Sequence, residues 1–277
     1  MIHFGKWVVK HKVLILVIAV LLLIPSAFGY FHTRVNYDIL NYLPDDIETM
    51  KGQEIMVDEF GTGAFSVCVV EGMSDKDISA MRKEMCKVEG VKDVLWYDSF
   101  MDLSVPIDLL PDSIKDVFVN KDADSTIMFV LYPNSISADE TMEAITQIRK
   151  LASKQCFISG MSAVVTDTKD LCDKEVPIYV TIAVILSLIV LSLTMDSFLV
   201  PIFFLLSIGM AIVYNLGTNV FKGEISYITQ ALTAVLQLGV TMDYSIFLWH
   251  SYQEEKKVNG KENKEAMADA IASTFSS

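Results

Sequence analysis

The sequence predicts a multi-pass α-helical membrane protein with four transmembrane helices and an extracytoplasmic α+β domain inserted between helices 1 and 2. Of its 277 residues, 52% are hydrophobic and 21% charged, with a mean hydropathy of +0.41 and a formal net charge of −13. The charge is unevenly placed, because residues 31–175 hold 27 acidic and 14 basic residues, whereas the rest of the chain holds 8 of each. An acidic soluble domain set in an uncharged apolar frame disfavours a soluble enzyme, a disordered chain and a basic nucleic-acid binder.

Uncharged stretches of the length needed to cross a bilayer occur four times along the chain. The expected spans are residues 13–31, 176–195, 197–221 and 225–250. The second span starts at Val176-Pro177, a plausible helix start, and a tight turn over residues 195–197 separates it from the third. A cleaved signal peptide is the alternative for the first span, but its apolar core exceeds the usual 7–15 residues, so we expect an uncleaved helix.

Lysines set the expected orientation of these spans. Lys6, Lys10 and Lys12 precede the first span without an acidic residue among them, and positive residues stay in the cytoplasm. Residues 1–12 and the amphipathic tail 251–277 are therefore expected inside, with residues 32–175 outside. We expect the protein in the cell membrane, of a bacterium.

The external segment alternates between the periodicities of short strands and of helices. Strands are predicted at residues 65–70, 91–97, 126–131 and 156–159, and helices at 74–88, 107–119 and 138–151. Ser74 and Ser137 are the expected helix caps. A connecting helix is predicted at 45–60, ended by Gly61-Thr62-Gly63. This order gives a β-α-β unit twice, compatible with a split βαβ sandwich.

The sequence contains no motif typical of a nucleotide, metal or cofactor site. The Gly61-Thr62-Gly63 segment precedes a strand, and the chain has no Gly-Lys-Ser/Thr phosphate loop. No pair among His3, His11, His32 and His250 has metal-ligand spacing. Four cysteines, Cys68, Cys86, Cys156 and Cys172, could form disulfides outside the cell. Small buried thiols are favoured, because Cys68 and Cys156 lie in predicted strands and Cys86 on an apolar helix face. We expect no metal, no cofactor and no enzyme.

Asp243 lies inside the fourth apolar span, where a carboxylate costs about 2.5–3.5 kcal/mol on insertion scales and rarely faces lipid. Burial disfavours its charged form, so we expect it to bind and release a proton, with Tyr244 able to donate a hydrogen bond to it. Gly239, one turn earlier, would let another helix pack closely. A supporting polar stripe is expected along this helix from Gln230, Thr233, Gln237, Thr241 and Tyr244. The alternative is a buried acid that only ties helices together.

These residues resemble the MMPL branch of the resistance–nodulation–division (RND) superfamily, and the likeness covers nearly the whole chain. Gly239-x-x-x-Asp243-Tyr244-x-x-Phe247-Leu248 is similar to the fourth-helix signature, and Asn36 to Asp45 is similar to the segment entering the external domain. Gly160, the Asp196-Ser197 junction and the 254–274 tail fit the same pattern. The resemblance implies a porter-like external domain and the N-terminal half of a transporter.

The implied function is proton-motive-force-driven export of lipids or of hydrophobic or amphiphilic compounds, with Asp243 and Tyr244 as the proton relay. The family's partner residues lie on a tenth helix in a second repeat, so the missing C-terminal half or a second copy is an expected partner. A truncated fragment, a half-transporter and a remnant without transport stay open, with truncation favoured. The alternatives in function are a non-transporting, sterol-sensing-like lipid-binding or receptor module and, less favoured, a protein-export accessory of the SecD/SecF kind.

Overall fold

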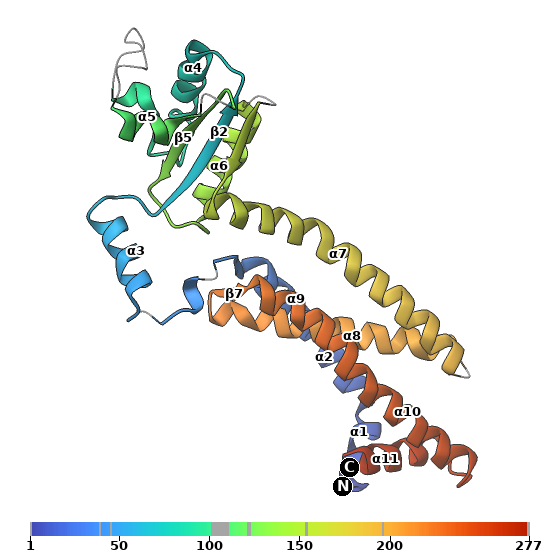
Figure 1. The fold of residues 1–277 in the computed structure, drawn as a ribbon. Coiled ribbons are helices and arrows are strands. Elements are labelled where there is room, and N and C mark those ends of the chain that lie inside the picture. Colours follow the sequence, from blue (N-terminus) through green and yellow to red (C-terminus); the bar gives the residue numbers. More distant parts are fainter. Residues whose placement is uncertain are drawn as a thin grey trace. The chain divides into compact units, whose positions relative to one another are not determined.

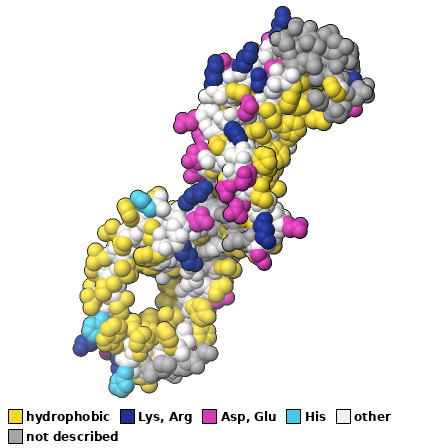
Figure 2. All heavy atoms as spheres, turned by 90° about the vertical axis from the view of Figure 1, so that its left-hand side faces the viewer, with side chains coloured by type: hydrophobic (Ala, Val, Ile, Leu, Met, Phe, Trp, Pro, Cys, Tyr) yellow, Lys and Arg dark blue, Asp and Glu magenta, His cyan; other side chains and the backbone are white. Residues whose placement is uncertain are grey.

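The computed structural model describes residues 2–38, 40–44, 46–100, 111–120, 123–152, 155–195 and 197–275. Contacts divide the chain into a membrane unit, Met1–Asn36 with Lys174–Ser277, and an α/β unit, Tyr37–Asp173 (Figure 1). On the face shown in Figure 2, hydrophobic side chains cover the long helices, and Asp, Glu, Lys and Arg gather over the α/β unit. Asp45 and Asp196 of the motifs above, and residues 107–110 of the predicted helix, lie outside the described residues.

A five-stranded antiparallel sheet organises the α/β unit. Its strands run in the order β3-β5-β2-β6, and β4 pairs with β5. The strands are β2 (Ala64–Glu71), β3 (Asp93–Leu95), β4 (Val119–Asn120), β5 (Ser125–Tyr132) and β6 (Cys156–Ser159). β5 lies between β2 and β3, and β2 lies between β5 and β6, so each β-α-β unit is split by a strand of the other. The predicted split βαβ arrangement is confirmed.

Helices α4 (Asp75–Met85), α5 (Asp112–Phe118) and α6 (Asp139–Leu151) contribute to the core against the sheet. α3 (Glu48–Asp58), which precedes β2, has no buried residue. Inward residues of β2 and β5 alternate with outward ones and meet Ile78 and Met85 of α4 and Ile145 and Ile148 of α6 in one core. Ser74 caps α4, since its hydroxyl accepts from the Asp77 amide. The predicted Ser137 cap is wrong: the N-cap is Ala138, without a side-chain bond, and Asp139 and Glu140 supply the favourable charge in the first turn.

All four cysteines are free thiols. Cys68 is buried in β2, and its hydrogen bond with Cys156 and its burial raise its pKa. Cys86 is exposed, so its predicted place on an apolar face is wrong. α4 ends at Met85, so Cys86 is its C-cap and lies outside the helix on which its position was predicted.

The membrane unit contains the long apolar helices. Its elements are α1 (Ile2–Lys10), α2 (Lys12–His32), the end of α7 (Met161–Thr194), α8 (Leu199–Gly217), α9 (Tyr227–Leu236), α10 (Met242–Lys257) and α11 (Asn263–Thr274). Within the described residues, four helical segments are long and apolar enough to cross a membrane: Lys12–His32, Met161–Thr194, Leu199–Phe221 and Tyr227–Lys257. This agrees with the number of spans expected from the sequence.

The helix that contains the second span begins 15 residues earlier than predicted, at Met161 rather than at Val176. Gly160, with φ +102°, turns the chain out of β6, and Ser162 then donates to the Phe65 carbonyl at 2.7 Å. Pro177 lies inside this helix. The helix continues through Pro177 to Thr194, although proline supplies no backbone donor there.

Close backbone contacts hold α2 against α8. A Cβ at Gly29 would lie 2.3 Å from the Gly217 carbonyl oxygen, and one at Gly217 would lie 2.1 Å from that of Ser26. The Tyr214 hydroxyl also donates to the Ala19 carbonyl. Small residues at a helix crossing allow this approach in a membrane, where packing rather than water exclusion drives association.

A parallel strand pair that the sequence did not predict follows α2. β1 (Arg34–Asn36) pairs with β7 (Glu224–Ser226), directly before α9. The Asn36 amide donates to the Glu224 carboxylate at 3.2 and 3.3 Å. The end of α2 and the start of α9 are thus joined.

The tail predicted as one amphipathic segment is the end of α10, a turn at Gly260 with φ +63°, and α11. Alternate alanines of α11, from Ala266 to Ala272, are buried. A Cβ at Gly5 would lie 2.1 Å from the Ala268 carbonyl oxygen, so α11 packs closely on α1.

Candidate functional site

Asp243 and Tyr244 lie at the start of α10, immediately after a break in the fourth span. Ser226 caps α9 by accepting from the Ile228 amide at 3.2 Å, and α9 runs to Leu236. Residues Gln237–Thr241 form a π-helical segment, after which α10 begins at Met242. A π segment inserts one extra residue into a turn and often accompanies a functional site. It therefore changes which way the Asp-Tyr pair points relative to α9.

Both predicted relay side chains are exposed within this chain. Tyr244 is 68% exposed, and Asp243 is exposed as well. Neither has a hydrogen bond or ion pair with any other residue that the structure describes. Acidic side chains in apolar spans are rare and mark functional sites more often than not, so Asp243 is the first candidate residue of this site.

The expected polar stripe is divided into local pairs instead of forming one network. Thr241 donates to the Gln237 side-chain oxygen at 2.9 Å, which joins the two ends of the π segment. Thr233 bonds only to the backbone of its own helix, at Thr229. The Gln230 amide reaches the Tyr30 hydroxyl at 3.5 Å, the outer limit for such a bond. Of the predicted stripe, only Gln237 and Thr241 lie in the segment that adjoins Asp243.

Gly239 has open space around it. A Cβ added there would meet no atom within 4 Å, so the close helix contact predicted at Gly239 does not occur among the described residues. Instead, Gly239 lines an apolar cavity of about 580 Å³ between α7 and the fourth span. Val180, Ala183 and Val235 are among its walls. An acyl chain or another apolar group matches this lining.

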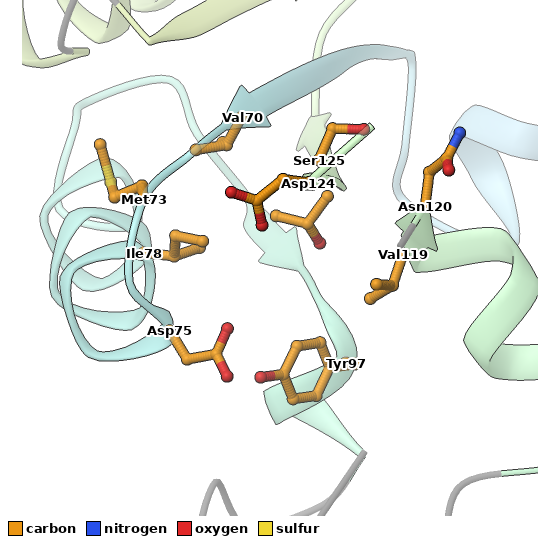
Figure 3. Close-up of a pocket in the computed structure, with 10 residues that line it drawn as sticks. Val70, Met73, Asp75, Ile78, Tyr97, Val119, Asn120, Asp124 and Ser125 are labelled. Carbon is orange, nitrogen blue, oxygen red and sulfur yellow. The ribbon is translucent and has the colours of Figure 1, made fainter. Parts of the chain in front are cut away.

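A smaller cavity of about 250 Å³ lies in the α/β unit, between α4 and the ends of β2 and β5 (Figure 3). Asp75 and Asp124 border it, and the Asp75 carboxylate faces the hydroxyl of Tyr97. Burial, followed by the Asp75 hydrogen bond and charge, raises the pKa of Tyr97. Tyr97 therefore stays a neutral phenol that donates to Asp75.

Four apolar helices and an inserted split βαβ domain define a multi-pass helical membrane protein rather than a soluble one. A sequence profile of the MMPL family matches residues 42–277, and the chain belongs to this family. Its members are RND-type transporters, not enzymes. No curated protein matches the chain closely enough to be named as a relative.

Two parts of the site's surroundings were missed by sequence reasoning. The π segment was not predicted, because the sequence Gln-Leu-Gly-Val-Thr of residues 237–241 was interpreted as a continuous part of the fourth span. The one residue in the sequence that could have indicated the apolar cavity is Gly239, which lines it. We predicted a close helix contact at Gly239 instead.

Proposed function

We propose that the protein is part of a proton-motive-force-driven exporter of lipids or of other hydrophobic or amphiphilic compounds across the cell membrane. In this proposal Asp243 and Tyr244 are the proton relay. The N- and C-termini are cytoplasmic, and the α/β unit is the external porter domain. Membership in the MMPL family supports transport. The observation that carries the relay is Asp243 itself, an acidic side chain in an apolar span without a partner among the described residues.

The energetics favour a proton-coupled role for this carboxyl. A charged Asp at the centre of a span costs about 2.5–3.5 kcal/mol, which a bound proton removes. A proton that crosses a potential of about 100 mV supplies about 2.3 kcal/mol, similar to that cost. Loading and unloading Asp243 can therefore drive a change in how α10 packs. Tyr244, next in sequence, donates to the carboxylate or returns the proton.

The π segment offers the place for that change. Gln237–Thr241 separates α9 from α10, and the Thr241 hydroxyl donates to the Gln237 side-chain oxygen across it at 2.9 Å. A π turn that relaxes to α geometry removes the extra residue from the turn and rotates α10 relative to α9. Protonation of Asp243 would set the balance between these two states.

The test is proton flux in membrane vesicles from cells that make the protein, with a pH-sensitive dye in the lumen and a fluorescent phospholipid as the transported probe. Asp243→Asn is expected to abolish proton flux and pH-driven lipid movement, and Tyr244→Phe to reduce both. Glu254→Gln removes an exposed acid of the same helix and is the matched control, expected to keep both activities. Undiminished proton-dependent movement by Asp243→Asn would refute the relay.

The apolar cavity of about 580 Å³ favours a second candidate, a non-transporting, sterol-sensing-like lipid-binding or receptor module. Such a protein would capture lipid in this cavity without moving it. Lipid capture that is insensitive to pH and to Asp243→Asn, with no proton flux in the native protein, would select this candidate over the exporter.

A further inference from the structure

We propose that α1, the start of α2 and α11 form a binding site for the headgroup of an anionic phospholipid. The site is a cavity of about 480 Å³. Within the membrane unit, α1 and α11 lie at the end away from β7 (Figure 1). Four lysines border the cavity: Lys6 and Lys10 from α1, Lys12 from the start of α2 and Lys264 from α11. This inference is independent of proton transport, because it involves no residue of the proposed relay.

Helix packing brings these lysines together from distant parts of the sequence. Lys6 and Lys10 are four residues apart, so they lie on the same face of α1. Gly5 lets the α11 backbone approach α1 at Ala268, where any Cβ would overlap the carbonyl oxygen at 2.1 Å. This contact holds Lys264, one turn before Ala268, beside the α1 lysines.

The cavity carries an excess of positive charge. Glu265 is the one acidic residue on its lining, against four lysines. Among the described residues, none of the four lysines has an ion pair, and all are exposed. Lys261 differs from them, because it pairs with Glu255 and Asp269 at 2.7 Å each. The chain thus neutralises Lys261 internally and leaves the four cavity lysines to an external anion.

Apolar neighbours place the cavity at headgroup depth. α2 is apolar from Val13 onward, so Lys12 lies where the hydrocarbon span begins. On α1, Ile2, Phe4 and Trp7 are each about half exposed, and Phe4 stacks with Trp7 and packs on Phe275. An exposed aromatic and aliphatic face next to lysines is the pattern of a helix lying in the membrane interface. A lipid phosphate at this depth would meet the lysines while its chains follow α2.

The occupant that fits is a membrane lipid rather than a soluble anion. The lysines carry the charge needed for a phosphate or another anionic headgroup, and juxtamembrane lysines attract anionic lipids. The apolar start of α2 and the aromatic residues of α1 supply a surface that only a lipid with acyl chains would use. Charge and depth together select the anionic phospholipid.

The test is native mass spectrometry of the purified protein in detergent, titrated with phosphatidylglycerol, phosphatidylcholine or inorganic phosphate. Phosphatidylglycerol is expected to bind more tightly than phosphatidylcholine, and millimolar phosphate is expected not to displace it. The double variant Lys6→Gln/Lys264→Gln should weaken phosphatidylglycerol binding by about 25-fold, since each lysine near the surface contributes about fivefold. Phosphatidylcholine binding should not change.

The matched control is Lys256→Gln/Lys257→Gln, which removes the same charge from exposed lysines outside the cavity. It should leave phosphatidylglycerol binding within about twofold of the native value. Equal weakening by both double variants would show a diffuse charge effect and overturn the site. Equal affinity for the two lipids, or displacement by phosphate, would overturn it as well. Circular dichroism of each variant verifies that α1 and α11 still form.

Discussion

Substitution of Gly217 by alanine tests the α2–α8 contact, a close helix crossing of the membrane unit. The new Cβ would lie 2.1 Å from the Ser26 carbonyl oxygen, 2.6 Å from its carbon and 2.7 Å from its Cα. All three are backbone atoms, so no side chain can rotate away, and the helices must separate. Overpacking of this kind costs about 1–3 kcal/mol. Alanine is also the better helix former by about 1 kcal/mol, which opposes this loss.

Gly209→Ala is the matched control on the same helix. A Cβ at Gly209 would meet no atom within 4 Å, so this variant gains helix propensity without a clash. Unfolding by sodium dodecyl sulfate, followed by circular dichroism, should place Gly217→Ala below the native protein and Gly209→Ala at or above it. The expected difference between the two variants in the free energy of unfolding is about 1–3 kcal/mol, because both gain helix propensity and only Gly217→Ala has the overlap. Equal midpoints for both variants would refute the close contact between α2 and α8.

Three further predictions concern the α/β unit. Trp96→Phe removes the indole N–H that donates to the Thr126 hydroxyl at 2.8 Å in the core. The free energy of unfolding should fall by about 1–3 kcal/mol, seen as a lower urea midpoint, and an unchanged midpoint would contradict this prediction. Arg82→Met removes the ion pair of 2.9 Å with Asp98, whose side chain is only 6% exposed. The free energy of unfolding should fall by about 3–5 kcal/mol in the same measurement, because a buried charge is left without a partner. A decrease below about 1 kcal/mol would argue against a buried pair. Cys86 is exposed, and partial desolvation of its thiol raises its pKa, so an impermeant maleimide should label it on intact cells, slowly at neutral pH and faster as pH rises above the ordinary thiol range. Labelling only after permeabilisation would contradict an external α/β unit.

Elements with a strong periodic signal were predictable. The strand predicted at 65–70 is β2, and the helix predicted at 138–151 is α6 within one residue, because alternation and helical spacing report which face is buried. The same signals gave the split βαβ order. Ser74 was recognised as a cap because a serine before an acidic turn is a local chemical pattern.

Features that depend on the surroundings of a segment were not predictable. The start of α7 was placed at Val176 because hydropathy changes there, although the backbone hydrogen bonding continues from Met161. The exposure of Cys86 depends on where α4 ends rather than on its periodicity. The π segment depends on how α9 and α10 are held at both ends, which no window of sequence reports.

Asp243 illustrates both sides of this division for the candidate site. Its position in an apolar span was evident from composition, and the structure places it on α10 as expected. Its surroundings were not evident, because the predicted stripe and the predicted contact at Gly239 depend on how separate helices pack. The proton relay itself stays a prediction.

The β1–β7 pair fixes the end of the membrane unit at which α9 begins. Its three residue pairs, from Arg34 with Glu224 to Asn36 with Ser226, fasten the start of α9 to the chain that leaves α2. A rotation at the π segment would therefore move α10 while α9 stays held at its capped end. Any larger movement of α9 must either break this ladder or pull on β1, whose last residue, Asn36, is covalently followed by the first residue of the α/β unit. Because β7 is hydrogen-bonded to β1, and Asn36 of β1 is directly followed by Tyr37 of the α/β unit, a movement of α9 would be transmitted along the chain to that unit.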